Sequence, residues 1–200
     1  MRPVFRCAIA LAALTSLAEA AAPVHPNTVA VVLDFRGPHS TRSINEMKRE
    51  LDSIMKGSGL TFDFRTREDA AQSTFDNLVV VRFDGSCLLE PNSYLYDERG
   101  PYAFTYSTDG ALQPFSEVAC DRVTASVRSA MSGLDYGQAD RLLGRALGRV
   151  VAHELVHMLA RSDHHAREGV TKAALSGSQL ISGELKLPPE DMARIRALGH

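Results

Sequence analysis

The sequence of 200 residues lacks tryptophan, a marked excess of either charge, and any apolar run long enough to cross a bilayer. Lysine and arginine total 22 against 24 aspartates and glutamates, so the net charge is −2 and the basic footprint of a nucleic-acid-binding protein is absent. The apolar stretch over residues 8–17 is shorter than the roughly 20 residues that a membrane span needs. The sequence also lacks internal repeats. With 44% hydrophobic residues, it predicts one globular domain, no nucleic-acid partner and no membrane span.

Basic residues are scattered along the chain, with one exception. Arg141, Arg145 and Arg149 follow one another at a spacing of four residues, which places them on one face of a helix. We interpret this row as a solvated helix face.

The first twenty residues are typical of an export signal. Arg2 and Arg6 give a positively charged start, residues 8–17 are apolar, and residues 18–20 read Ala-Glu-Ala, a cleavage-site pattern. We therefore expect cleavage near Ala20 and a secreted or periplasmic protein. An extended leader over residues 21–28 would precede a single domain over residues 29–200.

Cysteine is scarce, and neither remaining cysteine has the close C-x-x-C partner of a zinc site. Cys7 would leave with the export signal, so the exported chain keeps Cys87 and Cys120. In an oxidising compartment these two can form one disulfide, worth about 3–4 kcal/mol in the chain-entropy model. Two buried thiols, or ligands of a metal ion, are the alternatives.

Hydrophobic periodicity predicts an α+β order of elements. Residues 86–121 are expected to be irregular apart from one strand within them, because proline and glycine interrupt the pattern. The strands are expected over residues 29–35, 60–65, 78–83 and 102–106. The helices are expected after a capping box formed by Ser43 and Glu46, over residues 118–131, over residues 138–160 and over residues 190–198.

The most informative stretch lies near the end of the third expected helix, where His153, Glu154 and His157 form an H-E-x-x-H motif. Side chains at positions i and i+4 of a helix share one face, so both histidines can bind one metal ion. The histidines also continue the apolar stripe of the helix, which would give the ligands a rigid, inward-facing support. Glu154 is rotated away from the pair but stays near the open coordination position.

This motif and the order of elements resemble the metzincin clan of zinc metallopeptidases. Residues 148–157 are similar to the active-site helix of the clan, and residues 187–195 to the final helix of matrixin-type members. The chain also resembles a group of small exported bacterial proteins that carry the motif. The resemblance implies a mixed twisted sheet, an active-site helix and a C-terminal helix. It further implies that Tyr102, Phe104 and Tyr106 lie on an edge strand that pairs with an extended substrate.

The clan pattern H-E-x-x-H-x-x-G-x-x-H departs from this sequence after His157. Ala160 stands in place of the glycine and Asp163 in place of the third histidine, followed by His164 and His165. Because alanine adopts a positive φ less readily than glycine, we expect the helix to run slightly further and His164 to become the third ligand. Asp163, which keeps the register, is the alternative, and His165 is the third choice.

Two further features concern the metal site: the Met-turn of the clan, and a glutamate as an alternative third ligand. No methionine lies between the histidine cluster and the final helix, so the Met-turn of the clan is missing or replaced by Leu180 or Ile181. A later glutamate, Glu168 or Glu184, could serve as third ligand, although the local histidine cluster is the more economical choice.

Three protein ligands leave one position of a zinc ion open for water, which is typical of catalytic sites. Zinc lowers the pKa of that water to about 7 and polarises a peptide carbonyl. Glu154 would take the proton from the water and pass it to the leaving amine. We therefore predict a secreted metalloendopeptidase with one catalytic Zn²⁺ and a peptide or protein substrate. The alternatives are a non-catalytic, zinc-stabilised secreted binding domain and a metal-free interaction protein.

Overall fold

The computed structural model describes residues 27–90, 100–133 and 135–198. The predicted export signal and most of the predicted leader lie outside these residues. Within the described ranges, none of the helices has both the length and the apolar character that a membrane crossing requires.

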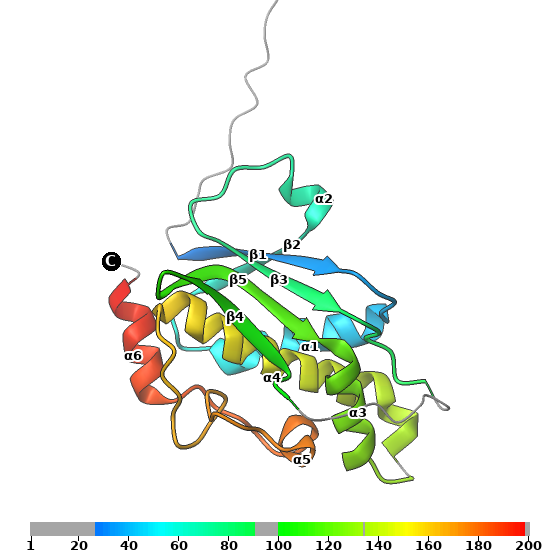
Figure 1. Cartoon of the computed structure of the whole chain (residues 1–200). Helices are drawn as coiled ribbons and strands as arrows, with labels where there is room; N and C mark the ends of the chain where they lie inside the picture. Colours follow the sequence, from blue (N-terminus) through cyan, green and yellow to red (C-terminus); the bar gives the residue numbers. More distant parts are fainter. Residues whose placement is uncertain (1–26, 91–99, 134, 199–200) are drawn as a thin grey trace, which may run out of the picture.

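A five-stranded sheet has the strand order β2-β1-β3-β5-β4 (Figure 1). The strands are β1 (Thr28–Phe35), β2 (Thr61–Thr66), β3 (Leu78–Asp84), β4 (Ala103–Thr108) and β5 (Ala111–Ala119). Neighbouring strands run parallel except at one edge, where β4 pairs antiparallel with β5. Strands of a parallel sheet are often covered on both faces and then read as continuous apolar runs. The run over residues 29–33 of β1 fits this rule, since all five side chains are buried.

Helices complete an α+β fold, as predicted, and most of them surround one long helix. They are α1 (Thr41–Met55), α2 (Arg67–Ala70), α3 (Cys120–Ala130), α4 (Ala139–Ala160), α5 (Gly177–Ile181) and α6 (Pro189–Leu198), with the 3₁₀ helix η1 (Asp135–Gln138) before α4. Helices α1 and α4 lie side by side on one face of the sheet (Figure 1). Helices α3, α5 and α6 also contact α4, so α4 is the central helix of the domain.

Two glycines of α4 allow α1 to approach closely. A Cβ atom at Gly148 would lie 2.8 Å from the carbonyl oxygen of Met47, and one at Gly144 would collide with the carbonyl of Ser43. Met47 and Leu51 of α1 are fully buried in the resulting contact. The backbone of α4 is therefore held against α1 before the helix reaches the two motif histidines.

Helix α1 begins before the residue predicted to cap it. Ser40 is the N-cap, and its Oγ accepts a hydrogen bond from the Ser43 backbone N–H at 3.5 Å. Ser43 lies inside the helix, is buried, and donates to Asp140 Oδ1 at 3.1 Å. The predicted capping box at Ser43 and Glu46 is therefore wrong, because another serine three residues earlier caps the helix.

The structure contains a strand that the sequence pattern did not reveal. The prediction of an irregular stretch around the strand at 102–106 is wrong for residues 111–119, where β5 pairs with β3 on one side and β4 on the other. Pro114 hides this strand, since proline cannot donate to a ladder and is tolerated only at edges or bulges. The register of β4 against β5 shifts between Thr105 and Ser107, and pairing with β3 begins only at Phe115. Pro114 thus lies where neither ladder needs its N–H.

The predicted disulfide is confirmed. Cys87 and Cys120 are bonded, with their Cα atoms 4.9 Å apart. Cys120 is the first residue of α3, and both cysteines are buried. The bond therefore ties the loop after β3 to the start of α3.

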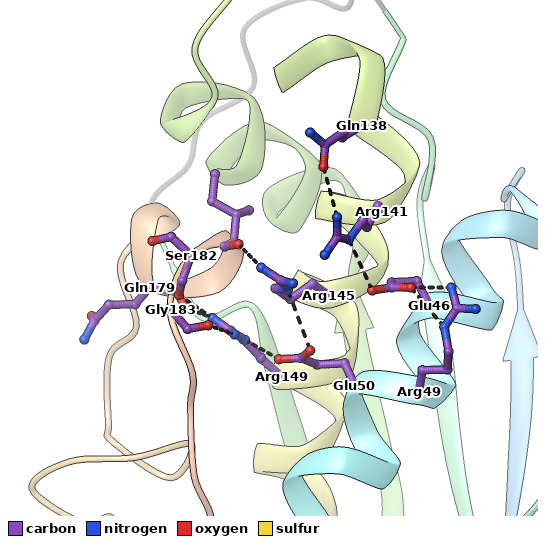
Figure 2. A network of polar contacts seen from close by, with 11 residues as sticks. Glu46, Arg49, Glu50, Gln138, Arg141, Arg145, Arg149, Gln179, Ser182 and Gly183 are labelled. Atoms are coloured by element: carbon purple, nitrogen blue, oxygen red, sulfur yellow. Dashed lines mark hydrogen bonds and ion pairs between the residues drawn. The ribbon is translucent and has the colours of Figure 1, made fainter. Parts of the chain in front are cut away.

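The row of arginines on α4 is not a solvated face, so that prediction is wrong. Exposure of the side chain falls along the row, from 57% at Arg141 to 22% at Arg145 and 1% at Arg149. Arg149 Nε donates to Glu50 Oε1 at 2.7 Å, and Arg145 Nε lies 3.7 Å from the other oxygen of Glu50. Figure 2 shows that Glu46 and Glu50 of α1 face this row.

The same arginines bind the backbone that follows α4. Arg149 Nη1 donates to the carbonyls of Gln179 and Ser182 at 2.5 and 2.9 Å, and Nη2 donates to that of Gly183 at 2.7 Å (Figure 2). Arg145 Nη1 donates to the carbonyl of Ile181 at 2.9 Å. The row therefore connects α1, α4 and the segment around α5. The donors of Arg149 are matched to a carboxylate and three carbonyls, whereas the buried Nε of Arg145 makes only the longer ion-pair contact with Glu50.

Replacing Arg149 with methionine should lower the free energy of unfolding by about 3–5 kcal/mol, because a buried carboxylate and three carbonyls lose their donor. The matched change Arg141→Met, at the exposed end of the row, should cost less than about 1 kcal/mol. Urea denaturation followed by circular dichroism measures both. Equal losses for the two variants would show that the buried network does not stabilise the fold.

Candidate metal centre

His153 and His157 project from the C-terminal part of α4 and face one another. Their Nε2 atoms are 3.0 Å apart. His165, from the segment after α4, joins them, and one nitrogen from each of the three rings lies within 4.8 Å of the others. Nitrogens that share one tetrahedral zinc ion at about 2.1 Å lie roughly 3.4 Å apart. The three rings are therefore close to the arrangement that a single ion requires.

Hydrogen bonds on the far side of the His153 and His157 rings fix the tautomers of these two histidines. His153 Nδ1 lies 2.9 Å from the carbonyl oxygen of Val170, and His157 Nδ1 lies 2.6 Å from that of Ser162. A carbonyl only accepts, so each Nδ1 carries the proton and each Nε2 presents a lone pair. This carbonyl support is typical of histidine ligands to metals.

The protonation of the two rings agrees with this assignment. Burial lowers the pKa of His153 to about 4, although the hydrogen bond to Val170 opposes the shift. Burial also lowers the pKa of His157 below its usual value. Both rings are therefore neutral at pH 7, and two lone pairs face each other across 3.0 Å. A shared cation would convert this repulsion into two favourable bonds.

Helix α4 runs slightly further than the clan pattern implies, as predicted. The residue that ends it is Arg161, one position after the one that corresponds to the clan glycine. Arg161 adopts the left-handed conformation, with φ 47°, and its backbone N–H donates to the carbonyl of His157. The carbonyl of the next residue, Ser162, is the acceptor for His157 Nδ1. The turn that ends the helix therefore also orients the second histidine.

The third histidine is not the one preferred from the sequence. The structure brings His165 to the other two rings, at centroid distances of 5.2 Å from His153 and 4.8 Å from His157. His164 is exposed and lies outside the three-histidine group, as does Asp163, which lines the adjacent cavity. The later end of α4 leads us to expect the third ligand one position after that of the clan pattern, at His164. The structure instead brings in His165, two positions after it, because the chain needs one more residue to turn back towards the other two rings.

The other predicted ligands and the substitutes for the Met-turn lie elsewhere. Glu168 and Glu184 are exposed and outside the group. Leu180 and Ile181 are buried in α5, which packs against α3 and α4. The residue that supports His153 is instead Val170, which is fully buried.

Glu154 is buried beside the histidines, with 4% of its surface exposed. Burial raises the pKa of its carboxyl to about 7, and a hydrogen bond from Thr105 opposes the shift. Thr105 Oγ1 donates to Glu154 Oε2 at 2.7 Å. Thr105 belongs to β4 and was not foreseen; the alternation of a strand, which turns it away from Phe104 and Tyr106, is the signal that could have indicated it.

A cavity of about 530 Å³ contains all three histidines and Glu154 on its lining. Most of the remaining wall comes from β4 with the residues before it and from residues 172–175, and Leu112, Val150 and Asp163 complete it. Of the three aromatic residues predicted on the edge strand, Tyr102 and Phe104 line this cavity. Tyr106 packs instead between the rings of Phe104 and Phe115, at centroid distances of 4.9 and 4.8 Å. Tyr102 lies just before the strand and its hydroxyl bonds Ser126 Oγ at 2.7 Å.

A buried threonine–aspartate pair supports two of the three histidines from behind. Thr171 Oγ1 donates to Asp191 Oδ2 of α6, and both residues are at most 1% exposed. Thr171 directly follows Val170, whose carbonyl holds His153. The carbonyl of Thr171 also accepts from the N–H of Ala166 at 3.1 Å, directly after His165. The C-terminal helix thus fixes the backbone that positions both rings.

No protein-family model matches the chain, and no curated protein matches its sequence. Any assignment of function therefore depends on the residues and geometry of this centre.

Exchange of Asp191 for asparagine should weaken zinc binding by about 10–100-fold, the range typical of residues that orient metal ligands. Glu190→Gln, an exposed change on the same helix, is the matched control and should leave the affinity unchanged. Competition with a chromophoric chelator measures the zinc dissociation constant. An unaltered constant in a folded Asp191→Asn protein would contradict the supporting role.

Proposed function

We propose that the protein is an exported, zinc-dependent metalloendopeptidase of the metzincin type. One observation carries the proposal. Two neutral imidazoles direct their Nε2 lone pairs at each other across 3.0 Å, a third imidazole joins them, and a buried carboxylate lines the same cavity. A purely structural zinc site would be closed by a fourth protein ligand. Within the described residues, the group that could hold an ion contains three.

The donor set fits zinc. Three neutral imidazoles are the ligand set of some catalytic zinc sites. A zinc ion held by His153, His157 and His165 would polarise a peptide carbonyl and lower the pKa of a water to about 7.

Glu154 is placed to move the proton. Thr105 engages Oε2, and in the described part of the chain no hydrogen bond occupies Oε1, which is left for a water molecule. A general base works best when its pKa is near the working pH, and burial brings the pKa of Glu154 to about 7. We assign Glu154 the roles of accepting a proton from the attacking water and delivering it to the leaving nitrogen.

Strand β4 offers a way to hold an extended peptide. It is the edge strand of the sheet, so its outer side has no strand partner in the described residues. The strand also forms one wall of the cavity that contains Glu154. A peptide that adds to this edge through backbone hydrogen bonds would pass the histidines in an extended conformation. Such binding favours cleavage within a chain.

Export agrees with the disulfide between Cys87 and Cys120, because disulfides persist in oxidising compartments. Export itself is part of the proposal, since the predicted export signal lies outside the described residues.

Exchange of Glu154 for glutamine tests the proposal. Zinc-loaded protein should cleave members of a random peptide library, and the variant should be slower by at least about 100-fold, because a general base contributes that much or more. Zinc content should stay at about one equivalent per chain in both proteins. Mass spectrometry of the products and metal analysis measure the two quantities.

Glu168→Gln, at an exposed position outside the metal group, is the matched control and should cleave as the unmodified protein does. Bound zinc without cleavage by any of the proteins would identify a non-catalytic zinc-stabilised domain instead. Equal rates for the Glu154 variant and the unmodified protein would contradict the role of Glu154.

A further inference from the structure

Lys172 contributes a positive charge to a cavity wall that is otherwise small or apolar. It lines the 530 Å³ cavity together with Ala173, Ala174 and Leu175, which follow it along the chain. Its side chain is half-buried. Apart from the histidines, it is the only basic side chain among the described residues that line this cavity.

The position of Lys172 relative to the metal centre is fixed by its backbone. Residues Ala166 and Lys172 form an isolated β-bridge, so Lys172 lies beside the residue that follows His165. The N–H of Lys172 donates to the carbonyl of Gly169 at 3.3 Å. Thr171, immediately before it, is anchored by Asp191. The lysine therefore starts from a rigid support next to the third histidine.

No carboxylate of residues 27–90, 100–133 and 135–198 neutralises this lysine. Among the described residues, none lies within ion-pair distance of it, whereas Lys186 pairs with Glu184 and Arg149 pairs with Glu50. A lysine that lines a cavity and has no carboxylate partner among the described residues can bind a carboxylate brought by a ligand without first breaking an ion pair.

The two carboxylates on the cavity lining have other surroundings. Glu154 is hydrogen-bonded by Thr105 at 2.7 Å. Asp163 is exposed and raises the pKa of His157 slightly against the larger effect of burial. Neither compensates Lys172, so the wall formed by residues 172–175 keeps its positive charge.

We propose that Lys172 selects substrates that carry a carboxylate close to the scissile bond. The inference rests on the proposed peptidase function and names its substrate class as acidic peptides. An ammonium group is a compact point charge on a flexible stem, so it would accept aspartate or glutamate side chains alike. The free carboxylate at a peptide C-terminus presents the same chemistry.

Four pools of random octapeptides test the inference on the zinc-loaded protein. Three are amidated at the C-terminus and carry Asp, Asn or Lys at one fixed position, and the fourth carries Asn and a free C-terminus. Initial rates should be about tenfold higher for the Asp pool than for the amidated Asn pool, the effect of one charge-assisted hydrogen bond. Mass spectrometry locates the cuts. A gain confined to the fourth pool would identify the peptide terminus as the source of the carboxylate.

Three variants test whether Lys172 causes the preference for the Asp pool. Lys172→Met should remove it, and Lys172→Glu should transfer it to the Lys pool. Arg167→Glu, at an exposed position outside the cavity lining, changes the net charge by the same amount and should leave the preference intact. A preference that survives Lys172→Glu would overturn the inference.

Binding to the Glu154→Gln protein separates this inference from the peptidase proposal. Fluorescence anisotropy of labelled pools should show about tenfold tighter binding of the Asp pool, weakening as salt is added. Acidic preference in binding without cleavage of any pool by the unmodified protein would refute the peptidase proposal and support Lys172. Equal rates and equal affinities for the Asp and Asn pools would overturn the assignment to Lys172.

Discussion

The structure depends on two hydrogen bonds from histidine Nδ1 atoms to backbone carbonyls. They fix His153 and His157 in the tautomer that turns both Nε2 lone pairs inward, where they lie 3.0 Å apart. Burial keeps the rings neutral, because it lowers the pKa of His153 to about 4 and shifts that of His157 in the same direction. Without a cation, the arrangement places two acceptors face to face and gains nothing from it. The metal-binding proposal follows from this conflict.

The rest of the fold holds the carbonyls and the helix in place. Glycines of α4 let α1 pack against its backbone, and Arg149 connects both helices to carbonyls in and directly after α5. Asp191 of α6 fixes Thr171, and with it the carbonyl of Val170 that holds His153. Strand β4 adds Thr105, which lines the same cavity and donates a hydrogen bond to Glu154. Elements far apart in sequence thus converge on α4.

Local patterns predict the parts that depend on neighbouring residues. The H-E-x-x-H spacing places His153 and His157 on one helix face, and the structure confirms their proximity. The partners over longer distances could not be predicted. Burial of Arg149 depends on α1 and α5, and β5 is masked by Pro114, which is tolerated because it lies in a bulge of β5 opposite β4. The sequence favours His164 as the third ligand, one position before His165. The motif does not indicate how many residues the chain needs to turn back after the left-handed Arg161.

Zinc affinity of two single variants tests the central claim most directly, because His164 and His165 are neighbours and only one belongs to the three-histidine group. Titration of metal-free protein, followed by isothermal calorimetry, should give about one zinc equivalent for the unmodified chain. His164→Ala should bind with the same affinity, and His165→Ala should lose at least about 100-fold, as expected for removal of a ligand. Absence of zinc binding in the unmodified chain, or a loss with His164→Ala alone, would contradict the account.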